Sequence, residues 1–147
     1  MVYNLVKQVI VEGKIKFFKY WRENMFVFFL VVLLLIPLAA IFFGLLWRKN
    51  SPRKINWVYG YRTSWSMKSQ ETWDFAHKYA GRILLYIGVP LTAISVIPIV
   101  LFKNRDINTL SSIVLGITGI QIICLIVPFI PTEIALRKNF DKNGNRK

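Results

Sequence analysis

Apolar residues fall into three long runs along the chain, at 25–47, 83–102 and 109–131. The first two runs contain no charged residue, and the third is interrupted only by Gln121 and small hydroxyl residues. A helix that rises about 1.5 Å per residue needs roughly 20 apolar residues to cross a hydrocarbon core of about 30 Å. Because a chain this short could not bury three such helices on every face, the pattern predicts an all-α membrane protein with three transmembrane helices.

Residues 1–24 show a different pattern, in which apolar and charged positions occupy opposite sides of a helix. Glu23 and the basic residues, Arg22 among them, fall outside the apolar arc. This predicts an amphipathic helix lying in the membrane interface, with a soluble helix packed on the following loop as the alternative. The next apolar run is too long for a signal peptide and no small-residue cleavage site follows it, so we expect it to be retained. The apolar arc holds Val2, Tyr3, Val6, Val9, Ile10, Phe17, Tyr20 and Trp21.

The loop at 48–82, between the first two apolar runs, is polar, aromatic and rich in signals for local structure. A turn is indicated at 50–52 by Asn, Ser and Pro in succession. Ser69, followed by an acid at Glu71, is typical of a helix N-cap. We expect this short loop helix to run straight into the second span.

Proline, glycine and polar residues refine the picture of the spans. Pro37 is expected to free one backbone carbonyl and to kink the first span. Residues 103–108 predict a tight turn that makes the second and third spans an antiparallel hairpin. Gly116 and Gly119 are small residues that permit close helix approach. The basic tail at 136–147 is expected to be disordered at its end.

A formal net charge of +13 would suggest nucleic-acid binding in a soluble protein, but here the basic residues lie between and beside the expected membrane spans. Basic residues beside spans are attracted to anionic lipid headgroups, so we expect lipid contact and no direct binding of nucleic acid. The long loop and the tail together hold thirteen Lys and Arg residues, against seven in the N-terminal segment and the short turn. The excess of basic residues predicts that the loop and the C-terminus face the cytoplasm.

Residues 59–68 of the loop are rich in side chains that can both stack and donate hydrogen bonds. An aromatic and arginine cluster at a membrane edge suits a peptide, a headgroup or another protein. The alternative is an aromatic belt with long cations that merely anchors the spans. We expect Arg62 to be the principal donor, with Tyr61 and Trp73 stacked around it and Gly60 allowing the backbone to turn. The candidate binding residues are Asn56, Tyr59, Gly60, Tyr61, Arg62, Thr63, Trp65, Ser66, Trp73, His77 and Arg82.

Catalytic and metal chemistry have few candidate residues in this chain. Cys124 is the single cysteine and His77 the single histidine, so no metal site and no cofactor is expected. His77 and Asp74 could touch on one helix, although no nucleophile is fixed by spacing. A small membrane enzyme or carrier that uses His77 and a loop hydroxyl stays open, as does a structural subunit of a larger complex. The spans lack charged residues for an ion relay, so only a homo-oligomer could form a pore.

Part of the loop forms a motif that continues into the second span. Its residues are Gly60-Tyr61-Arg62-Thr63, Ser66, Trp73, His77 and Gly81, with Asn56 before them. This motif resembles the signature of the SdpI family, bacterial multi-span proteins named for an immunity protein against a sporulation-delaying toxin. The resemblance covers about residues 30–135. Ser64 stands where the family often has proline, and the founding protein has further spans before this unit.

The resemblance implies a non-enzymatic protein of the bacterial cell membrane that protects against, or senses, a membrane-active peptide toxin. It also implies that a cytoplasmic repressor-like protein is captured at the membrane. Neither implication follows from the composition or spacing of the residues.

Overall fold

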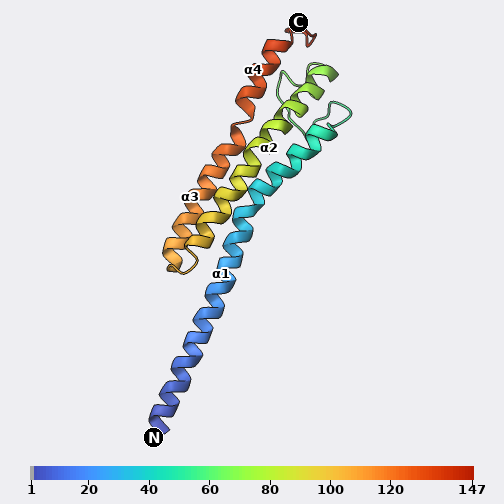
Figure 1. Ribbon diagram of the computed structural model, residues 1–147. Helices are drawn as coiled ribbons and strands as arrows, with labels where there is room; N and C mark the ends of the chain where they lie inside the picture. The colour runs from blue at the N-terminus through green and yellow to red at the C-terminus, as the bar shows by residue number, and fades with distance from the viewer. Residues whose placement is uncertain (1) are drawn as a thin grey trace.

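A computed structural model describes residues 2–147, and the side chains of 1–6 and of residue 9 lie outside this description. The chain forms four helices: α1 (Val2–Lys49), α2 (Gln70–Leu101), α3 (Ile107–Ile126) and α4 (Phe129–Asn139). α1, α2 and α3 lie side by side, and α4 continues upward from α3 toward the C-terminus (Figure 1). Within 2–147 the only β pairing is an isolated bridge between Phe140 and Arg146.

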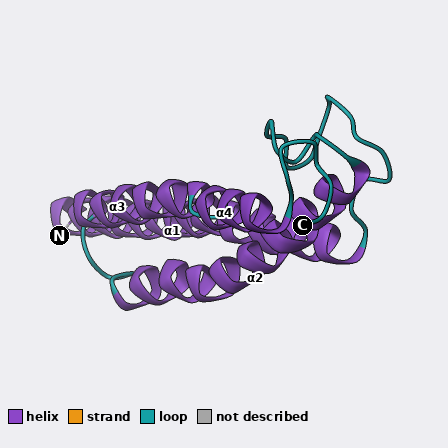
Figure 2. Ribbon diagram, turned by 90° about the horizontal axis from the view of Figure 1, so that it is seen from above, coloured by secondary structure: helices purple, strands orange, loops and turns teal. Residues whose placement is uncertain are grey.

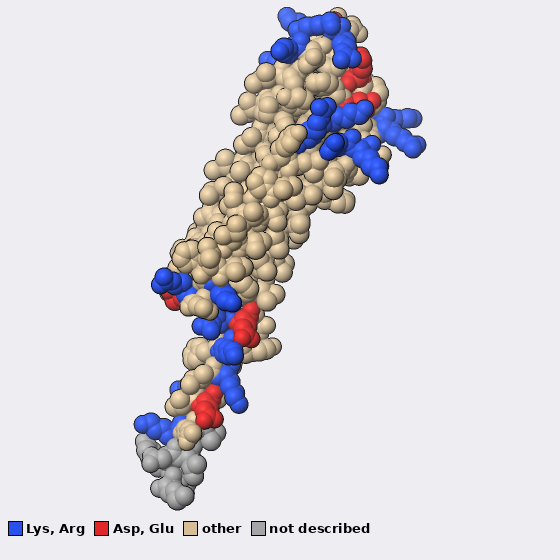
Figure 3. Space-filling view, viewed as in Figure 1, with Lys and Arg blue, Asp and Glu red and all other residues tan. Residues whose placement is uncertain are grey.

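Three helical stretches are long and apolar enough to cross a membrane, which confirms the predicted all-α membrane fold. They are Ile10–Lys49, Gln70–Leu101 and Ile107–Asn139. Lys and Arg gather at both ends of the bundle and along the protruding part of α1, and they leave an uncharged belt between (Figure 3). The short loop helix that begins after Ser69 does run straight into the second span.

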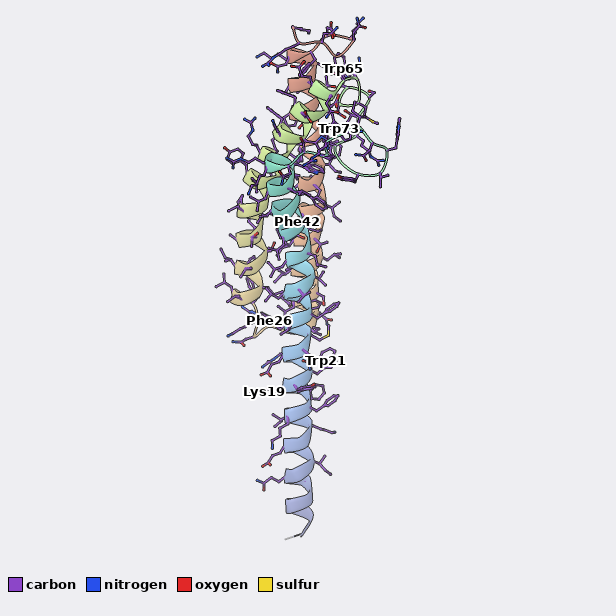
Figure 4. All side chains as sticks on the ribbon, turned by 90° about the vertical axis from the view of Figure 1, so that its right-hand side faces the viewer. Lys19, Trp21, Phe26, Phe42, Trp65 and Trp73 are labelled. Carbon is purple, nitrogen blue, oxygen red and sulfur yellow. The ribbon has the colours of Figure 1, made fainter. Side chains whose placement is uncertain are left out.

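The N-terminal segment and the first span form one continuous helix. No break occurs at the expected boundary near residue 24, and the first half of α1 extends beyond the bundle, with Lys19 and Trp21 on it (Figure 4). Its aromatic side chains are exposed, Phe17 at 64% and Tyr20 at 68%. Val2, Tyr3, Val6 and Val9 lie outside the described side chains. Interface binding by this segment stays a prediction.

Pro37 shapes the contact between the three spans near the middle of the first apolar run. A proline has no N–H to donate to the carbonyl four residues earlier, so the Leu33 carbonyl is left free. Gln121 Nε2 from α3 donates to this oxygen at 2.8 Å and to Ser95 Oγ on α2 at 2.7 Å. The carbonyl predicted to be freed by Pro37 therefore becomes the point where α1, α2 and α3 are joined by hydrogen bonds.

Close helix approach occurs at other glycines than those predicted. A Cβ on Gly116 or Gly119 would meet no atom within 4 Å, so these residues are not used for packing in this chain. A Cβ on Gly81 would lie 3.0 Å from the Gly44 carbonyl oxygen, and one on Gly88 would lie 2.8 Å from Ile41 Cγ1. The crossing of α1 and α2 is thus the close one.

The third span and the tail also differ from expectation. α3 ends at Ile126, and α4 begins at Phe129 because Pro131 cannot donate to the carbonyl four residues earlier, whereas the first turn of a new helix needs no such donor. The tail is ordered: Leu136 and Phe140 are buried against Tyr61, Ala76 and Ala80. Local composition suggested disorder, but the tail folds because these two side chains pack on a core made by Tyr61 of the loop and by α2.

Candidate functional site

The loop platform, defined as residues 50–69 with the first two turns of α2 (70–77), lies at the end of the bundle that also holds the C-terminus. The loop projects sideways from the helices when the molecule is seen from above (Figure 2). Trp65 and Trp73 lie at this end, far from the protruding half of α1 (Figure 4). All of the candidate residues predicted from the sequence except Arg82 belong to this platform.

Ser66 and Thr72 fix the backbone where the loop enters α2. Ser66 Oγ accepts from the Thr63 N–H at 2.9 Å and donates to the Tyr61 carbonyl at 2.8 Å. Thr72 N–H and the Ser69 side chain form one half of a capping box, and the Ser69 N–H donates to Thr72 Oγ1 at 2.9 Å in the other. The predicted N-cap at Ser69 is confirmed, and each buried hydroxyl has a partner.

His77 is fully buried and joins the loop to α2 through both ring nitrogens. Its Nδ1 lies 2.8 Å from the Trp73 carbonyl, so Nδ1 carries the proton and donates. Nε2 is then the acceptor for the Tyr61 N–H at 2.9 Å. The geometry assigns His77 as a neutral imidazole that holds the backbone of the loop.

Gly60 allows this contact for two separate reasons. Its φ is +120°, a conformation that residues with a side chain rarely adopt. A Cβ there would also lie 2.4 Å from His77 Nε2 and 3.3 Å from Trp73 Cη2. The predicted freedom of the backbone at Gly60 is therefore observed, and it brings the chain against the imidazole.

Trp73 is fully buried and anchors the start of the loop. Its indole Nε1 donates to the Pro52 carbonyl at 2.8 Å, and its ring lies 4.4 Å from that of His77, centroid to centroid. Asp74 accepts from Ser51 Oγ at 3.2 Å. Among the described residues no hydrogen bond joins Asp74 to His77, which the sequence had left open.

Tyr61 connects the loop to the C-terminal helix. Its hydroxyl donates to the Phe129 carbonyl at 3.1 Å and lies 3.5 Å from Glu133 Oε1, and its ring stacks on Phe129 at 5.1 Å. Burial, with the nearby Glu133 carboxylate, raises the pKa of the Tyr61 phenol above its ordinary value. The phenol therefore remains a neutral hydrogen-bond donor.

The other candidate residues lie on the surface of the platform. Asn56 Oδ1 accepts from the Val58 and Tyr59 N–H groups at 3.0 Å each, which closes a local turn. Arg62 is exposed and donates to the Trp57 carbonyl. The predicted stacking of Tyr61 and Trp73 around Arg62 is wrong, because both rings are turned into the core.

Trp65 and Arg82 complete the predicted set. The Trp65 ring has Lys68 Nζ at 3.9 Å and the Arg137 guanidinium carbon at 5.5 Å from its centroid, so it is flanked by two cations. Arg82 is exposed and bonds only to the Lys78 carbonyl one turn earlier on α2, at 3.4 Å. Arg82 therefore does not join the rest of the cluster through a hydrogen bond.

Several contributors were missed in the sequence. Trp57 and Val58 are the most exposed apolar residues of the loop, at 80% and 84%. The tail contributes two backbone acceptors: Ser69 Oγ donates to the Gly144 carbonyl at 2.8 Å, and Lys68 Nζ donates to the Lys142 carbonyl at 2.6 Å. The adjacent aromatic and β-branched pair in a polar loop was a visible signal, whereas docking of the tail had no local one.

The buried hydroxyl and imidazole groups of the platform are already hydrogen-bonded, which leaves few groups available for catalysis or metal binding. Among the residues that the structure describes, no hydrogen bond links His77 to a hydroxyl group, and no group of three His, Cys, Asp or Glu could hold a metal ion. The arrangement is suited to holding a loop in a fixed shape and presenting its exposed aromatic and basic side chains.

Comparison with known proteins supplies a family. A family model described as the SdpI/YfhL protein family matches residues 53–132. The chain is also 33% identical over 54 residues to a protein of Bacillus subtilis (strain 168) described as "Uncharacterized protein YfhL". That match covers 37% of this chain and 49% of the relative, so the chain spans about half the length of the relative. No solved structure matches.

Proposed function

Because the chain belongs to the SdpI/YfhL protein family, we propose that it is a non-enzymatic membrane protein that protects against, or senses, a membrane-active peptide toxin. Membership of this family suggests a membrane protein related to immunity. The observation that carries the proposal is the platform within the matched region. Its buried residues hold a rigid frame at the end of the spans, and exposed aromatic and basic residues surround that frame.

The candidate residues divide into two roles under this proposal. Trp73, His77, Ser66 and Tyr61 hold the shape of the loop, because each is buried and hydrogen-bonded. The peptide contacts instead come from the exposed side chains Tyr59, Arg62 and Arg82 of the predicted set, with the half-buried Trp65 beside them and Trp57 added. Aromatic and arginine side chains are the types enriched where peptides are recognised.

The topology and the relay to a partner are part of the same proposal. We place the platform and the tail on the cytoplasmic side, as their excess of basic residues favours. A cytoplasmic repressor-like protein would then find the platform and the docked tail on one surface. The bonds from Lys68 and Ser69 to the tail support a single combined surface.

The enzyme or carrier that uses His77 with a loop hydroxyl is the less favoured function. Both ring nitrogens of His77 are engaged by the backbone, and Ser66 Oγ is engaged by Thr63 and Tyr61. These bonds support a structural role for the two residues. Turnover of a lipid or peptide that is lost in His77→Ala, with the chain still folded, would favour the enzyme.

The test is survival of a bacterium that expresses the full chain and is challenged with a panel of membrane-active peptides. We expect protection against at least one peptide, and Arg62→Ala should reduce it because Arg62 is an exposed donor beside Trp57. The matched control is Arg105→Ala, an exposed arginine at the opposite end of the bundle. Unchanged protection in Arg62→Ala, at equal amounts of protein in the membrane, would contradict the assignment of the site.

A further inference from the structure

An apolar cavity lies where the platform meets the spans. It has a volume of about 400 Å³ and is lined by Ala39 and Phe43 of α1, Leu84 of α2, and Leu125 and Phe129 at the junction of α3 and α4. The volume falls in the range of roughly 300–1,000 Å³ typical of small-molecule sites. Since Ala39 and Phe43 belong to the last part of the first span and Gly60 and Tyr61 belong to the loop, the cavity reaches from the loop to the apolar part of the spans.

A second groove, whose wall mixes apolar residues with polar and basic ones, adjoins this cavity. It is lined by Asn50, Arg53, Lys54 and Asn56 of the loop, among others, and has a volume of about 750 Å³. Trp47 and Tyr59 line both hollows, so the two are neighbours that share walls. The chain thus offers an apolar compartment and a basic compartment in contact with each other.

The charged side chains that line the two hollows are basic. Arg53 and Lys54 line the groove, and among the described residues no acid lines either hollow. Arg48 and Lys49 end α1 next to them. Two acids lie behind the walls: Asp74 accepts from Ser51 of the groove, and Glu133 lies beside the hydroxyl of Tyr61. The groove is therefore suited to an anion.

We infer that this pair of hollows binds one anionic phospholipid, with an acyl chain in the apolar cavity and the phosphate headgroup beside Arg53 and Lys54. An acyl chain matches the apolar lining, and the phosphate matches two adjacent cations. A lipid bound in this way holds the loop against the membrane surface. This inference does not rest on the proposed immunity function, because any bilayer with anionic lipid supplies the ligand.

The test uses the full chain reconstituted in vesicles that contain equal amounts of phosphatidylglycerol and phosphatidylcholine with the same acyl chains. The protein is extracted in mild detergent, and retained lipids are counted by native mass spectrometry. We expect one phosphatidylglycerol per chain to survive extraction in preference to phosphatidylcholine. Equal retention of the two lipids, or retention of neither, would overturn the inference.

Two sets of variants test the two compartments. Ala39→Phe adds a ring to the wall of the apolar cavity and should abolish retention, while Leu38→Phe adds a ring at a neighbouring position that is 52% exposed and should not. Arg53→Gln with Lys54→Gln should weaken the preference for phosphatidylglycerol by roughly 30-fold, as expected when two basic residues near headgroups are removed. Lys103→Gln with Arg105→Gln removes the same charge at the other end and should leave the preference unchanged.

The variants also separate misfolding from loss of the site. The Arg53 and Lys54 side chains are exposed, so that double variant keeps the core intact even where Ala39→Phe lowers stability. The inference would be wrong if the Ala39→Phe variant and the Arg53 and Lys54 double variant both retained phosphatidylglycerol as wild type does. The inference would also be wrong if Lys103→Gln with Arg105→Gln lost the preference for phosphatidylglycerol to the same extent. The same holds if an added apolar peptide were the one competitor that displaced the retained lipid.

Discussion

The two ends of the spans are both basic, yet they are built differently. The turn at 103–106 is fully exposed, and its main side-chain contact is Asp106 accepting from the Thr109 N–H at 2.9 Å to cap α3. The platform buries Ser66, Thr72, Trp73 and His77 completely. Basic charge alone is enough to place an end at lipid headgroups. A buried polar network adds a fixed shape, which recognition needs and anchoring does not.

The largest expected effect comes from Gly60→Ala. The added Cβ would clash with His77 Nε2, and φ at this residue is unfavourable for alanine. We expect the free energy of unfolding to fall by about 3 kcal/mol or more. Unfolding in mixed detergent micelles measures this.

Gly116→Ala is the matched control for that measurement. The site around Gly116 is open, and alanine favours a helix by about 1 kcal/mol over glycine. Stability should therefore stay the same or rise. A Gly60→Ala chain as stable as wild type would show that the loop does not approach His77.

His77→Leu should have the next largest effect. It leaves the Tyr61 N–H without an acceptor and the Trp73 carbonyl without the side-chain donor, at a cost of about 1–3 kcal/mol for the buried unpaired group. The same unfolding experiment, read through tryptophan fluorescence of the platform, measures it. If His77→Leu left the free energy of unfolding unchanged at neutral pH and altered only its dependence on pH, a chemical role of the imidazole would be favoured instead.

Tyr61→Phe removes one hydrogen bond and keeps the aromatic stack. The lost bond from the hydroxyl to the Phe129 carbonyl should cost about 1 kcal/mol. We expect exchange of amide hydrogens in α4 to accelerate, because Tyr61 ties the loop to that helix. Accelerated exchange only in the turn at 103–106 would be inconsistent with this tie.

Lys103→Gln with Arg105→Gln tests the turn end and should have almost no effect on folding. Exposed substitutions away from buried contacts usually change stability by within about 0.5 kcal/mol. Thermal unfolding of the pair beside wild type measures this. A loss as large as that of His77→Leu would remove the distinction between the two ends.

Acid should affect both ends in the same small way. The backbone N–H of Asn145 lowers the pKa of Asp141, and that of Thr109 lowers the pKa of Asp106. A depressed pKa means that each carboxylate stabilises its turn at neutral pH, and that this contribution is lost as pH falls through the folded pKa. The amide resonances of Asn145 and Thr109 should titrate with midpoints below the ordinary 3.8. A midpoint at or above 3.8 would contradict the two capping contacts.

Periodicity and local motifs predicted much of this fold. The three apolar runs, the Ser69 cap and the carbonyl freed by Pro37 each depend on residues within one or two turns, so the sequence reveals them. The cluster of stacking and donor residues was located in the same way. Its division into buried and exposed members was not.

The features that escaped prediction depend on contacts distant in sequence. Which glycines face a neighbouring helix depends on how the spans are rotated, so Gly44 and Gly81 could not be told from Gly116 and Gly119 by residue type. Leu136 and Phe140 are buried against Tyr61 of the loop and against Ala76 and Ala80 of α2, which are distant in sequence. Arg62 is exposed and donates to the Trp57 carbonyl instead of lying between Tyr61 and Trp73, and no local pattern shows that.

Hydrogen exchange of the Tyr61 amide tests the central claim most directly, because that N–H reports whether the loop is held by His77. In the full chain in micelles or nanodiscs, we predict strong protection of this amide compared with the exposed turn at 103–106, and loss of protection in His77→Leu. Exchange of the Tyr61 amide in the wild-type chain as fast as in that turn would contradict an ordered platform.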